Sequence, residues 1–349
     1  MVLTKSLILG IETSCDDTAC ALVETSGEVV SSVVSSQLEQ HRPYGGVVPE
    51  IASREHLRNW SAVLAETLAR GGRELDEVDA IAATRAPGLI GSLLVGLSLG
   101  KALARGLEKP FYGVHHLEGH LYSPFLQVGG DPAQPAPESF AALVVSGGHT
   151  ALYRVVGGEV ETLAETRDDA IGEVFDKVGK RLGLPYPQGP RVDEIAEEWT
   201  GATPRFALAR CSDGSLDFSF SGLKTETLRA LERALGREGV SDPAHTAAVL
   251  AGFRLAAVDQ LLDRLERLFR LERFGVLAVS GGAAANRLLR RRLPEWAARR
   301  RVDLRLVDLT FAGDNAAMIA HAAARRFLAG DAGDTAGIEA ASRLALGSA

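Results

Sequence analysis

The sequence is short of the residues that mark several familiar classes of protein. Its 349 residues include only three cysteines, Cys15, Cys20 and Cys211. An odd set of three builds neither a disulfide framework nor a four-cysteine zinc site, which indicates a reducing compartment. Positive charge is not in excess either, since the net charge is −7 and the pI about 5.7. Any contact with nucleic acid must therefore use a local basic patch or a partner's charge.

Long hydrophobic runs are also missing. The longest weakly polar stretch, residues 88–100, ends at Lys101, and it is shorter than the roughly 20 residues that a membrane-spanning helix needs. At the N-terminus only Lys5 precedes a short apolar run, and acidic residues follow at once, unlike a secretory signal. We therefore expect a cytoplasmic protein without a membrane partner.

What is present is typical of an α/β protein of about two domains. Hydrophobic residues make up 46% and aromatic residues only 6%. Two strand–turn–strand patterns, one in each half, predict two similar lobes, with the Pro- and Gly-rich residues 129–137 as their boundary. The predicted strands are residues 6–11, 19–23, 141–145, 151–156 and 274–279, and the predicted helices include 55–70, 89–105 and 315–329.

The segment His115–His120 holds three of the eight histidines. In a helix, His116 and His120 lie four residues apart on one face, a spacing at which two imidazoles can bind one metal ion. A zincin-type protease helix needs Glu directly after the first His, where this chain has Leu117. An acidic third ligand is expected, and Asp314 is a candidate, although spacing alone favours a helix cap for it.

Two Ser-Gly-Gly turns, 146–148 and 280–282, each follow an apolar strand. Glycines at such turns let backbone N–H groups approach phosphate oxygens. Neither turn is a Walker loop or a dinucleotide fingerprint. Together with the acidic turn at Asp16 and Asp17 they indicate a nucleotide-binding cleft, although a tight turn explains either loop alone.

Three further segments have ordinary structural explanations beside functional ones. Residues 168–177 predict a helix that Asp168 or Asp169 caps, and Phe218–Thr225 predicts the end of a strand and the start of a helix. Asp176, Gly189 and Asp193 could together face a ribose or a polar acyl group. The arginines crowded between residues 287 and 305 suit a phosphate backbone or a solvated helix face equally well.

Eight segments in this order resemble one family, the universal tRNA threonylcarbamoyladenosine transferases of the bacterial TsaD type, formerly described as O-sialoglycoprotein endopeptidases. These segments are Ile8–Asp17, Gly45–His56, His115–His120, Val145–Thr150, Asp168–Lys177, Phe218–Thr225, Ser280–Arg287 and Asp314–Ala320. The resemblance implies an α/β, actin/Hsp70/sugar-kinase-like (ASKHA) fold of two ribonuclease-H-like lobes with a central nucleotide cleft. We expect one lobe from residues 1–110, completed by 315–349, and a second from 111–314 that carries the metal and adenylate site.

The resemblance also implies the reaction. The threonylcarbamoyl group passes from threonylcarbamoyl-AMP to the N6 amine of the adenosine adjacent to the anticodon (position 37) in tRNAs reading ANN codons, and AMP is released. One divalent metal ion, Fe²⁺ first and Zn²⁺ second, is implied on His116, His120 and Asp314. The implied substrate-binding residues are Val144, Val145, Ser146, Gly147, Gly148, Asp176, Gly189, Asp193 and Asn286. Our candidate catalytic bases are Asp16 and Asp17, with Glu12 and His149 as alternatives.

The implied partners are tRNA, an inactive paralogue (TsaB) and a small ATPase (TsaE). The archaeal and eukaryotic branch has a metal-binding tyrosine where this chain has Val144, which favours the bacterial branch. The alternatives are a metallopeptidase, an ATPase or kinase of the same fold, and a non-enzymatic scaffold.

Overall fold

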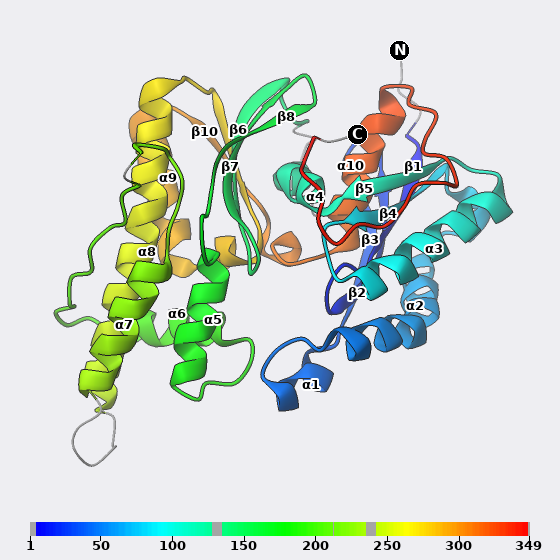
Figure 1. Cartoon of the computed structure of the whole chain (residues 1–349). Helices are drawn as coiled ribbons and strands as arrows, with labels where there is room; N and C mark the ends of the chain where they lie inside the picture. Colours follow the sequence, from blue (N-terminus) through cyan, green and yellow to red (C-terminus); the bar gives the residue numbers. More distant parts are fainter. Residues whose placement is uncertain (1–4, 128–134, 212, 235–241, 348–349) are drawn as a thin grey trace. The chain divides into compact units, whose positions relative to one another are not determined.

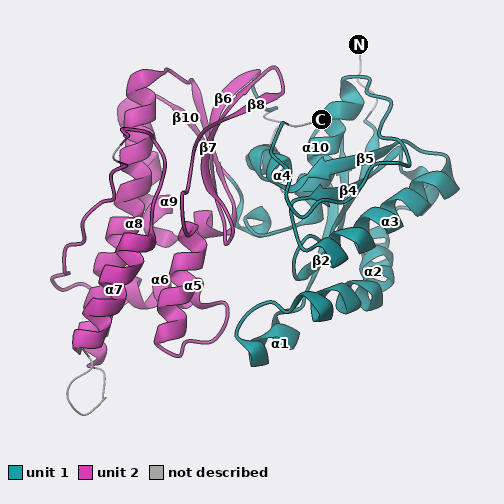
Figure 2. Cartoon of the chain, viewed as in Figure 1, with its two compact units in different colours: residues 1–137, 307–349 teal, residues 138–306 magenta. Residues whose placement is uncertain are grey.

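The computed structural model describes residues 5–127, 135–211, 213–234 and 242–347, and the chain forms two compact units (Figures 1 and 2). Unit 1 is residues 1–137 with 307–349, and unit 2 is residues 138–306. The predicted boundary segment ends where unit 2 begins, although its residues 129–134 lie outside the described part. The division differs from the expected lobes, because residues 111–137 and 307–314 group with unit 1 rather than with a second lobe.

Unit 1 is built on a mixed sheet whose strand order is β3-β2-β1-β4-β5. Its strands are β1 (Leu7–Glu12), β2 (Asp17–Glu24), β3 (Val29–Ser36), β4 (Ala80–Ala86) and β5 (Phe111–His115). Its helices are α1 (Leu38–His41), α2 (Pro49–Gly71), α3 (Ile90–Leu107), α4 (His116–Tyr122) and α10 (Ala316–Leu328), with 3-10 turns at Arg42–Tyr44, Leu75–Glu77, Ser123–Phe125 and Leu309–Phe311. Every residue of β1 is buried, as expected of a central strand covered on both faces.

Unit 2 repeats this plan with the strand order β10-β9-β6-β7-β8. Its strands are β6 (Ser139–Val145), β7 (Thr150–Val156), β8 (Glu159–Glu165), β9 (Val276–Ser280) and β10 (Asp303–Leu306). Its helices are α5 (Ile171–Arg181), α6 (Gln188–Glu198), α7 (Ser221–Ala234), α8 (Pro243–Leu271) and α9 (Arg287–Arg300), with a 3-10 turn at Gly282–Ala285.

The two sheets share one topology. In each, three antiparallel strands in sequence are followed by two that join in parallel beside the first strand. The two hairpins predicted from the sequence are β1–β2 and β6–β7, so both predictions are confirmed. The repeated topology matches the expected pair of similar lobes.

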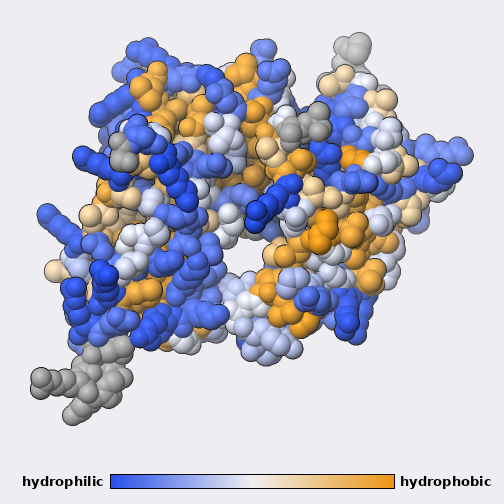
Figure 3. Space-filling model, in the orientation of Figure 1, coloured by the Kyte–Doolittle hydropathy of each residue, from blue (hydrophilic) through white to orange (hydrophobic). Residues whose placement is uncertain are grey.

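Helix α3 is the one described helix that is long and apolar enough, by length and composition, to cross a membrane. It packs against β4 and α2 within unit 1, where Leu93, Leu97 and Ala104 are buried. Ile90 and Leu94 remain about half exposed (48% and 50%). The face drawn in Figure 3 accordingly mixes hydrophilic and apolar residues over both units.

Helix α10 completes unit 1 by packing on β1, β2 and α4. It approaches α4 closely at Gly119, where an added Cβ would lie 2.9 Å from Met318 Cγ. A larger residue at this position would require the side chain of Met318 or Ile319 to shift. The contact matters because α4 and the residues just before α10 carry the predicted metal ligands.

Candidate metal centre and adenylate-binding residues

Helix α4 begins at His116, which is a candidate metal ligand. The preceding residue, His115, caps the N-terminus of the helix. His115 Nδ1 accepts a hydrogen bond from Leu117 N at 3.2 Å. Burial lowers the pKa of His115 to about 4, so the ring is neutral and can accept. The helix then places His116 and His120 on one face, as the four-residue spacing predicts. Both rings are buried.

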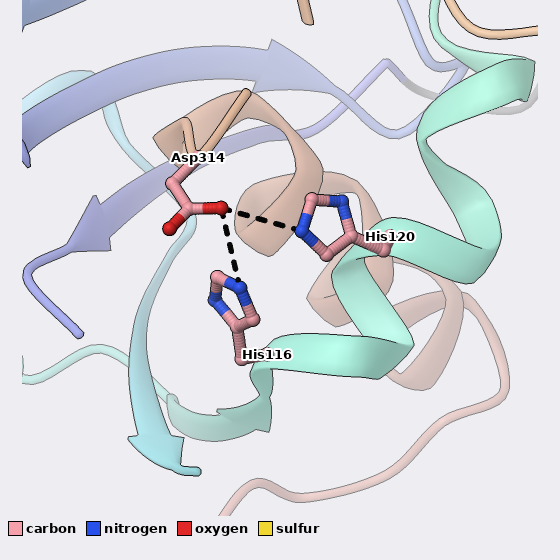
Figure 4. Close-up of side chains that lie close together, drawn as sticks. All are labelled: His116, His120 and Asp314. Atoms are coloured by element: carbon pink, nitrogen blue, oxygen red, sulfur yellow. Dashed lines mark ion pairs between the residues drawn. The ribbon is translucent and has the colours of Figure 1, made fainter. Parts of the chain in front are cut away.

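The two histidines converge on a single carboxylate oxygen. His116 Nε2 and His120 Nε2 each lie 3.3 Å from Asp314 Oδ1 (Figure 4). Ligand atoms about 2.1 Å from a tetrahedral metal ion are about 3.4 Å apart, so these separations fit one shared ion. Among the described residues, neither ring nitrogen of His120 has a hydrogen-bond partner of normal geometry. Leaving such buried groups unpaired costs about 1–3 kcal/mol, which a bound cation would offset.

A buried carboxylate orients the first of the two ligands. Glu12, at the end of β1, has Oε2 3.0 Å from His116 Nδ1 and accepts from Thr84 Oγ1 at 2.7 Å. With Nδ1–H donated to Glu12, His116 Nε2 is the nitrogen that is left to bind a metal ion beside Asp314. Metal-binding histidines commonly donate their other nitrogen to a carboxylate in this way. The sequence suggests only a base role for Glu12, because nothing local links it to a histidine 104 residues away.

The charges around the cluster favour a cation. Burial opposes protonation of His116, but Asp314 and Glu12 outweigh it and raise the pKa of His116 well above its usual value. Burial likewise opposes charge on Asp314, yet His116 and His120 hold the pKa of that carboxyl well below its usual range. Burial lowers the pKa of His120. Two imidazoles and one carboxylate can therefore bind a divalent ion and leave positions open for substrate or water.

The acidic turn between β1 and β2 carries the candidate bases. Asp17 Oδ1 is buried and has no hydrogen-bond partner among the described residues. Burial, together with the nearby carboxylates of Asp16, Asp314 and Glu12, raises the pKa of Asp17 to about 7 against the opposing effect of a hydrogen bond with Ser36. A buried histidine holds the turn, since His56 Nε2 lies 3.0 Å from Cys15 O. A carboxylate that titrates near neutral pH is suited to general-base catalysis.

In unit 2, the two Ser-Gly-Gly turns lie at the same edge of one sheet. Val144 and Val145 are the buried end of β6, and β9 runs parallel beside it, with Val144 opposite Ser280. Gly281 has φ +92°, and a Cβ there would collide with the backbone of Val145, so this position requires glycine.

The first turn is closed by its own hydrogen bonds and is open outward. Ser146 N donates to His149 O at 2.8 Å, and His149 N donates to Ser146 Oγ at 3.1 Å. A Cβ added at Gly147 or Gly148 would meet no described atom within 4 Å. The fold itself therefore does not require these glycines, and the space beside them can admit a ligand.

The remaining predicted adenylate residues form two contacts within unit 2. Asp176 Oδ1 accepts from Gly189 N at 2.7 Å, and burial raises the pKa of Asp176. Asp193 is buried, and its Oδ1 accepts from Asn286 Nδ2 at 2.7 Å. Its Oδ2 accepts from Arg287 N at 3.1 Å. The structure therefore brings Asp176 to Gly189 and Asp193 to Asn286, and contact with a nucleotide stays a prediction for all four.

Two structural predictions for unit 2 are wrong. Asp168 does not cap α5, whose N-cap is Ala170; instead it accepts from Phe220 N and Ser221 N at the start of α7. No strand ends at Phe218 among the described residues, which give only an isolated bridge to Thr166. Asp168 thus makes long-range hydrogen bonds in place of the local cap that the sequence suggests, and Phe218 pairs with Thr166 at a single position.

These features define a class: a protein with an α/β fold of the actin/Hsp70/sugar-kinase type that carries a candidate metal site of two histidines and one aspartate. Solved structures support the fold. The chain is similar to T. kodakarensis HypF (TM-score 0.58, 15% identity, covering 93% of this chain and 47% of that chain, about half its length). It is also similar to component A of the Acidaminococcus fermentans (R)-2-hydroxyglutaryl-CoA dehydratase (TM-score 0.51, 14% identity, 92% and 98% covered).

The sequence comparisons identify the family. The chain is 47% identical over 323 residues, 92% of each chain, to a tRNA N6-adenosine threonylcarbamoyltransferase of Burkholderia thailandensis. It is 48% identical over 318 residues, 90% of each chain, to the Pelobacter propionicus protein of the same name. The family model for TsaD, tRNA N6-adenosine threonylcarbamoyltransferase, matches residues 28–321. The chain therefore belongs to the TsaD family, and it is an enzyme that transfers a threonylcarbamoyl group to N6 of an adenosine in tRNA.

Proposed function

We propose that this enzyme takes the threonylcarbamoyl group from threonylcarbamoyl-AMP and transfers it to the adenosine at position 37 of tRNAs reading ANN codons. The N6 nitrogen attacks the carbamoyl carbon, the bond from that carbon to the phosphate oxygen breaks, and AMP leaves. The observation that carries the proposal is the convergence of His116 and His120 on Asp314 in a chain of this family.

His116, His120 and Asp314 hold the metal ion, with Glu12 orienting His116. Fe²⁺ is the first choice, because two histidines and one carboxylate with open positions suit a non-haem Fe²⁺ site, and Zn²⁺ is the second. When bound, the ion polarises the carbamoyl carbonyl or binds the donor's oxygens.

The residues of unit 2 bind the adenylate. Backbone groups of Val144, Val145, Ser146, Gly147 and Gly148 bear the phosphate, whose negative charge grows as AMP leaves. Asp176, Gly189 and Asn286 contact the nucleoside. Asp193 contributes through Asn286, because both of its oxygens already accept from the protein's own donors.

Asp17 takes the proton from N6 as the nitrogen attacks, and Asp16 is the second candidate. The free Oδ1 of Asp17 and its pKa of about 7 support this role. Adenine N6 is a weak nucleophile, so removal of its proton during attack is needed. The base must also leave its stack in the tRNA to react.

The reaction takes place in the cytoplasm with tRNA, TsaB and TsaE as partners and without a membrane. The acidic charge of −7 supports the need for a partner, since a protein of this charge attracts the tRNA backbone poorly by itself.

The test is the nucleoside content of tRNA after reaction. Unmodified tRNA is incubated with threonylcarbamoyl-AMP, the partner proteins and the intact chain, His116→Ala or His245→Ala, then digested and analysed by mass spectrometry. Since His245 is exposed, its variant is the control. Threonylcarbamoyladenosine should form with the intact chain and the control but not with His116→Ala. Equal product from His116→Ala would contradict the proposed site.

A further inference from the structure

The segment that follows α10 forms a strap, residues 331–345, which contains no regular helix or strand. It runs beside β5 in unit 1 and is the red trace in Figure 1. Arg326, near the end of α10, fixes its beginning through ion pairs with Asp331 at 2.7 Å and Asp334 at 3.1 Å. Farther along, Ile338 and Ala340 pack against the core of unit 1.

The strap covers the edge of the sheet, since β5 is its last strand. Asp334 N donates to Phe111 O at 2.7 Å, and Gly113 N donates to Asp334 Oδ2 at 2.7 Å. Tyr112 Oη donates to Asp331 O at 2.6 Å. An uncovered edge strand leaves backbone donors and acceptors unpaired. These contacts are explained by protection of the edge alone.

Protection of the backbone groups at the edge does not explain the contact of the strap with the side chain of His115. His115, the last residue of β5, has its side-chain Nε2 3.1 Å from Leu344 O. Because His115 Nδ1 accepts from Leu117 N, its Nε2 carries the proton and donates it to Leu344 O. The strap thus fixes the tautomer and the orientation of the ring that caps α4, and α4 begins with the ligand candidate His116.

The same strap is joined to the other side of the metal site. Asp314 lies just before α10, α10 packs on α4 at Gly119, and its C-terminal end leads into the strap. The strap is therefore connected to the three candidate ligands in two ways. It contacts His115, which caps α4, and it continues from α10, which follows Asp314.

We propose that the strap positions the metal site through His115, so that the affinity for metal depends on the hydrogen bond from His115 Nε2 to Leu344 O. His115 is a positioning residue that does not touch the ion. The inference rests on the proposed metal site, and it assigns a role to a segment that none of the eight resembling motifs includes.

The experiment measures the affinity of the metal-free chain for Zn²⁺ by competition with a chelator. His115→Asn keeps a side-chain oxygen able to cap α4 but is too short to reach Leu344. A chain shortened to end at Arg343 removes the acceptor and leaves His115 intact. Each should bind Zn²⁺ about tenfold more weakly, the loss typical of an outer contact to a metal ligand. The two changes combined should cost no more than either alone, because they break the same hydrogen bond.

Two controls separate positioning from stability. Leu344→Ala keeps the backbone carbonyl and should leave Zn²⁺ affinity unchanged. Lys101→Ala removes a different strap contact, that of Lys101 Nζ with Ile338 O, and should lower the melting temperature without changing the affinity.

Affinities of the shortened chain and His115→Asn within about twofold of the intact chain would overturn the inference, as would losses that multiply. If the shortened chain does not fold, His115→Asn still decides the question. The proposed metal site is judged separately, because the intact chain must bind one Zn²⁺ and His120→Ala must lose it. Failure of that comparison would overturn the metal site and this inference together.

Discussion

Each unit contains a buried polar cluster, and the two clusters differ in how many hydrogen bonds their members make within the protein. In unit 2, Asp193 accepts from Asn286, Arg287 N and Arg254, while Arg254 also binds Glu197 at 2.6 Å. In unit 1, three ligating groups point at one another, and His120 has no hydrogen-bond partner among the described residues. The first cluster holds its parts together by hydrogen bonds and ion pairs, although Arg254 Nε has no partner among the described residues. The second brings two imidazoles and a carboxylate to one point, which a metal ion would complete.

An unpaired buried group is not a site by itself. His321, in α10, also lacks partners among the described residues, and burial lowers its pKa to about 4. It stands apart from the other ligating side chains and is simply a neutral buried ring. Convergence of several such groups on one point separates the metal cluster from His321, and substitutions in the two clusters should therefore have opposite consequences.

The largest expected effect is the loss of metal in His120→Leu. A similarly sized apolar side chain removes one of three ligands, so the variant should copurify with no metal and transfer at least about 100-fold more slowly. The metal-free variant should be about as stable as the metal-free parent, because the unpaired buried Nδ1 is removed while the 3.3 Å contact of Nε2 with Asp314 is lost. Metal content by mass spectrometry and the free energy of unfolding in urea check both parts. A metal-free variant markedly less stable than its parent would make this cluster structural, like that of unit 2.

Asp17→Asn should have the next largest effect, because Asp17 Oδ1 is the other unpaired acceptor near the metal ligands. Loss of a general base typically slows a reaction about 10²–10⁴-fold. In the parent, the transfer rate should rise with pH about tenfold per unit below the pKa of Asp17, which is about 7 without metal and lower once a cation binds near Asp314. The measurement is a pH–rate profile. If the rate of Asp17→Asn still rises with pH as in the parent, Asp16 would be the general base instead.

The pH dependence of the stability of the metal-free chain gives a second measure of the pKa of Asp17. Its pKa is raised in the fold, so the unfolded chain binds fewer protons between about pH 4 and 7. The free energy of unfolding should therefore fall as the pH rises through this window. Asp17→Asn should abolish that part of the fall.

Arg254→Met tests the buried polar cluster of unit 2 around Asp193. The substitution leaves the carboxylates of Asp193 and Glu197 without their buried cation, which should cost about 3–5 kcal/mol of stability. Metal affinity should not change, because the metal ligands belong to unit 1. Urea unfolding compared with the exposed control Arg229→Met is the measurement. A stability close to that of the control would show that the cluster is not structural.

Glu12→Gln should have a smaller effect than removal of a ligand. The amide keeps the shape of the carboxylate but loses its charge, and with it much of the orientation of His116. We expect about 10–100-fold weaker Zn²⁺ binding, which titration against a chelator measures. Thr84→Val, which removes a donor to Glu12, should weaken binding less. An unchanged Zn²⁺ affinity in Glu12→Gln would show that Glu12 does not contribute to metal binding.

The sequence predicted those parts of the site that local spacing encodes. The four-residue interval of His116 and His120 and the strand–turn–strand patterns around residues 12–18 and 146–149 are short-range signals, and the structure has the predicted helix and hairpins. Glu12 with His116, Asp168 with α7 and Leu344 with His115 join residues far apart in the chain. No periodicity records such contacts, since they depend on which elements pack together. The family resemblance supplied Asp314, where spacing alone favoured a helix cap.

Substitution of arginines between residues 287 and 305 should have the smallest effect, and that effect should be on tRNA binding. The structure engages several of them in ion pairs: Arg291 with Glu197, Arg292 with Asp259, Arg300 with Glu266 and Arg305 with Asp303. Much of the charge of this face is thereby neutralised, as in a solvated helix face. Arg299 and Arg301 are exposed and have no ion pair among the described residues, so they remain the best candidates for phosphate contacts.

Arg299→Glu combined with Arg301→Glu should weaken tRNA binding by at most about tenfold, with adenylate binding unchanged. If both arginines contact phosphates, the slope of log affinity against log salt should fall by about two, roughly one for each contact. Binding titrations at several salt concentrations are the measurement, with exposed Arg229→Glu as the control. An unchanged affinity and slope would assign these arginines to a solvated face, and tRNA recognition would then lie with other residues or with the partner proteins.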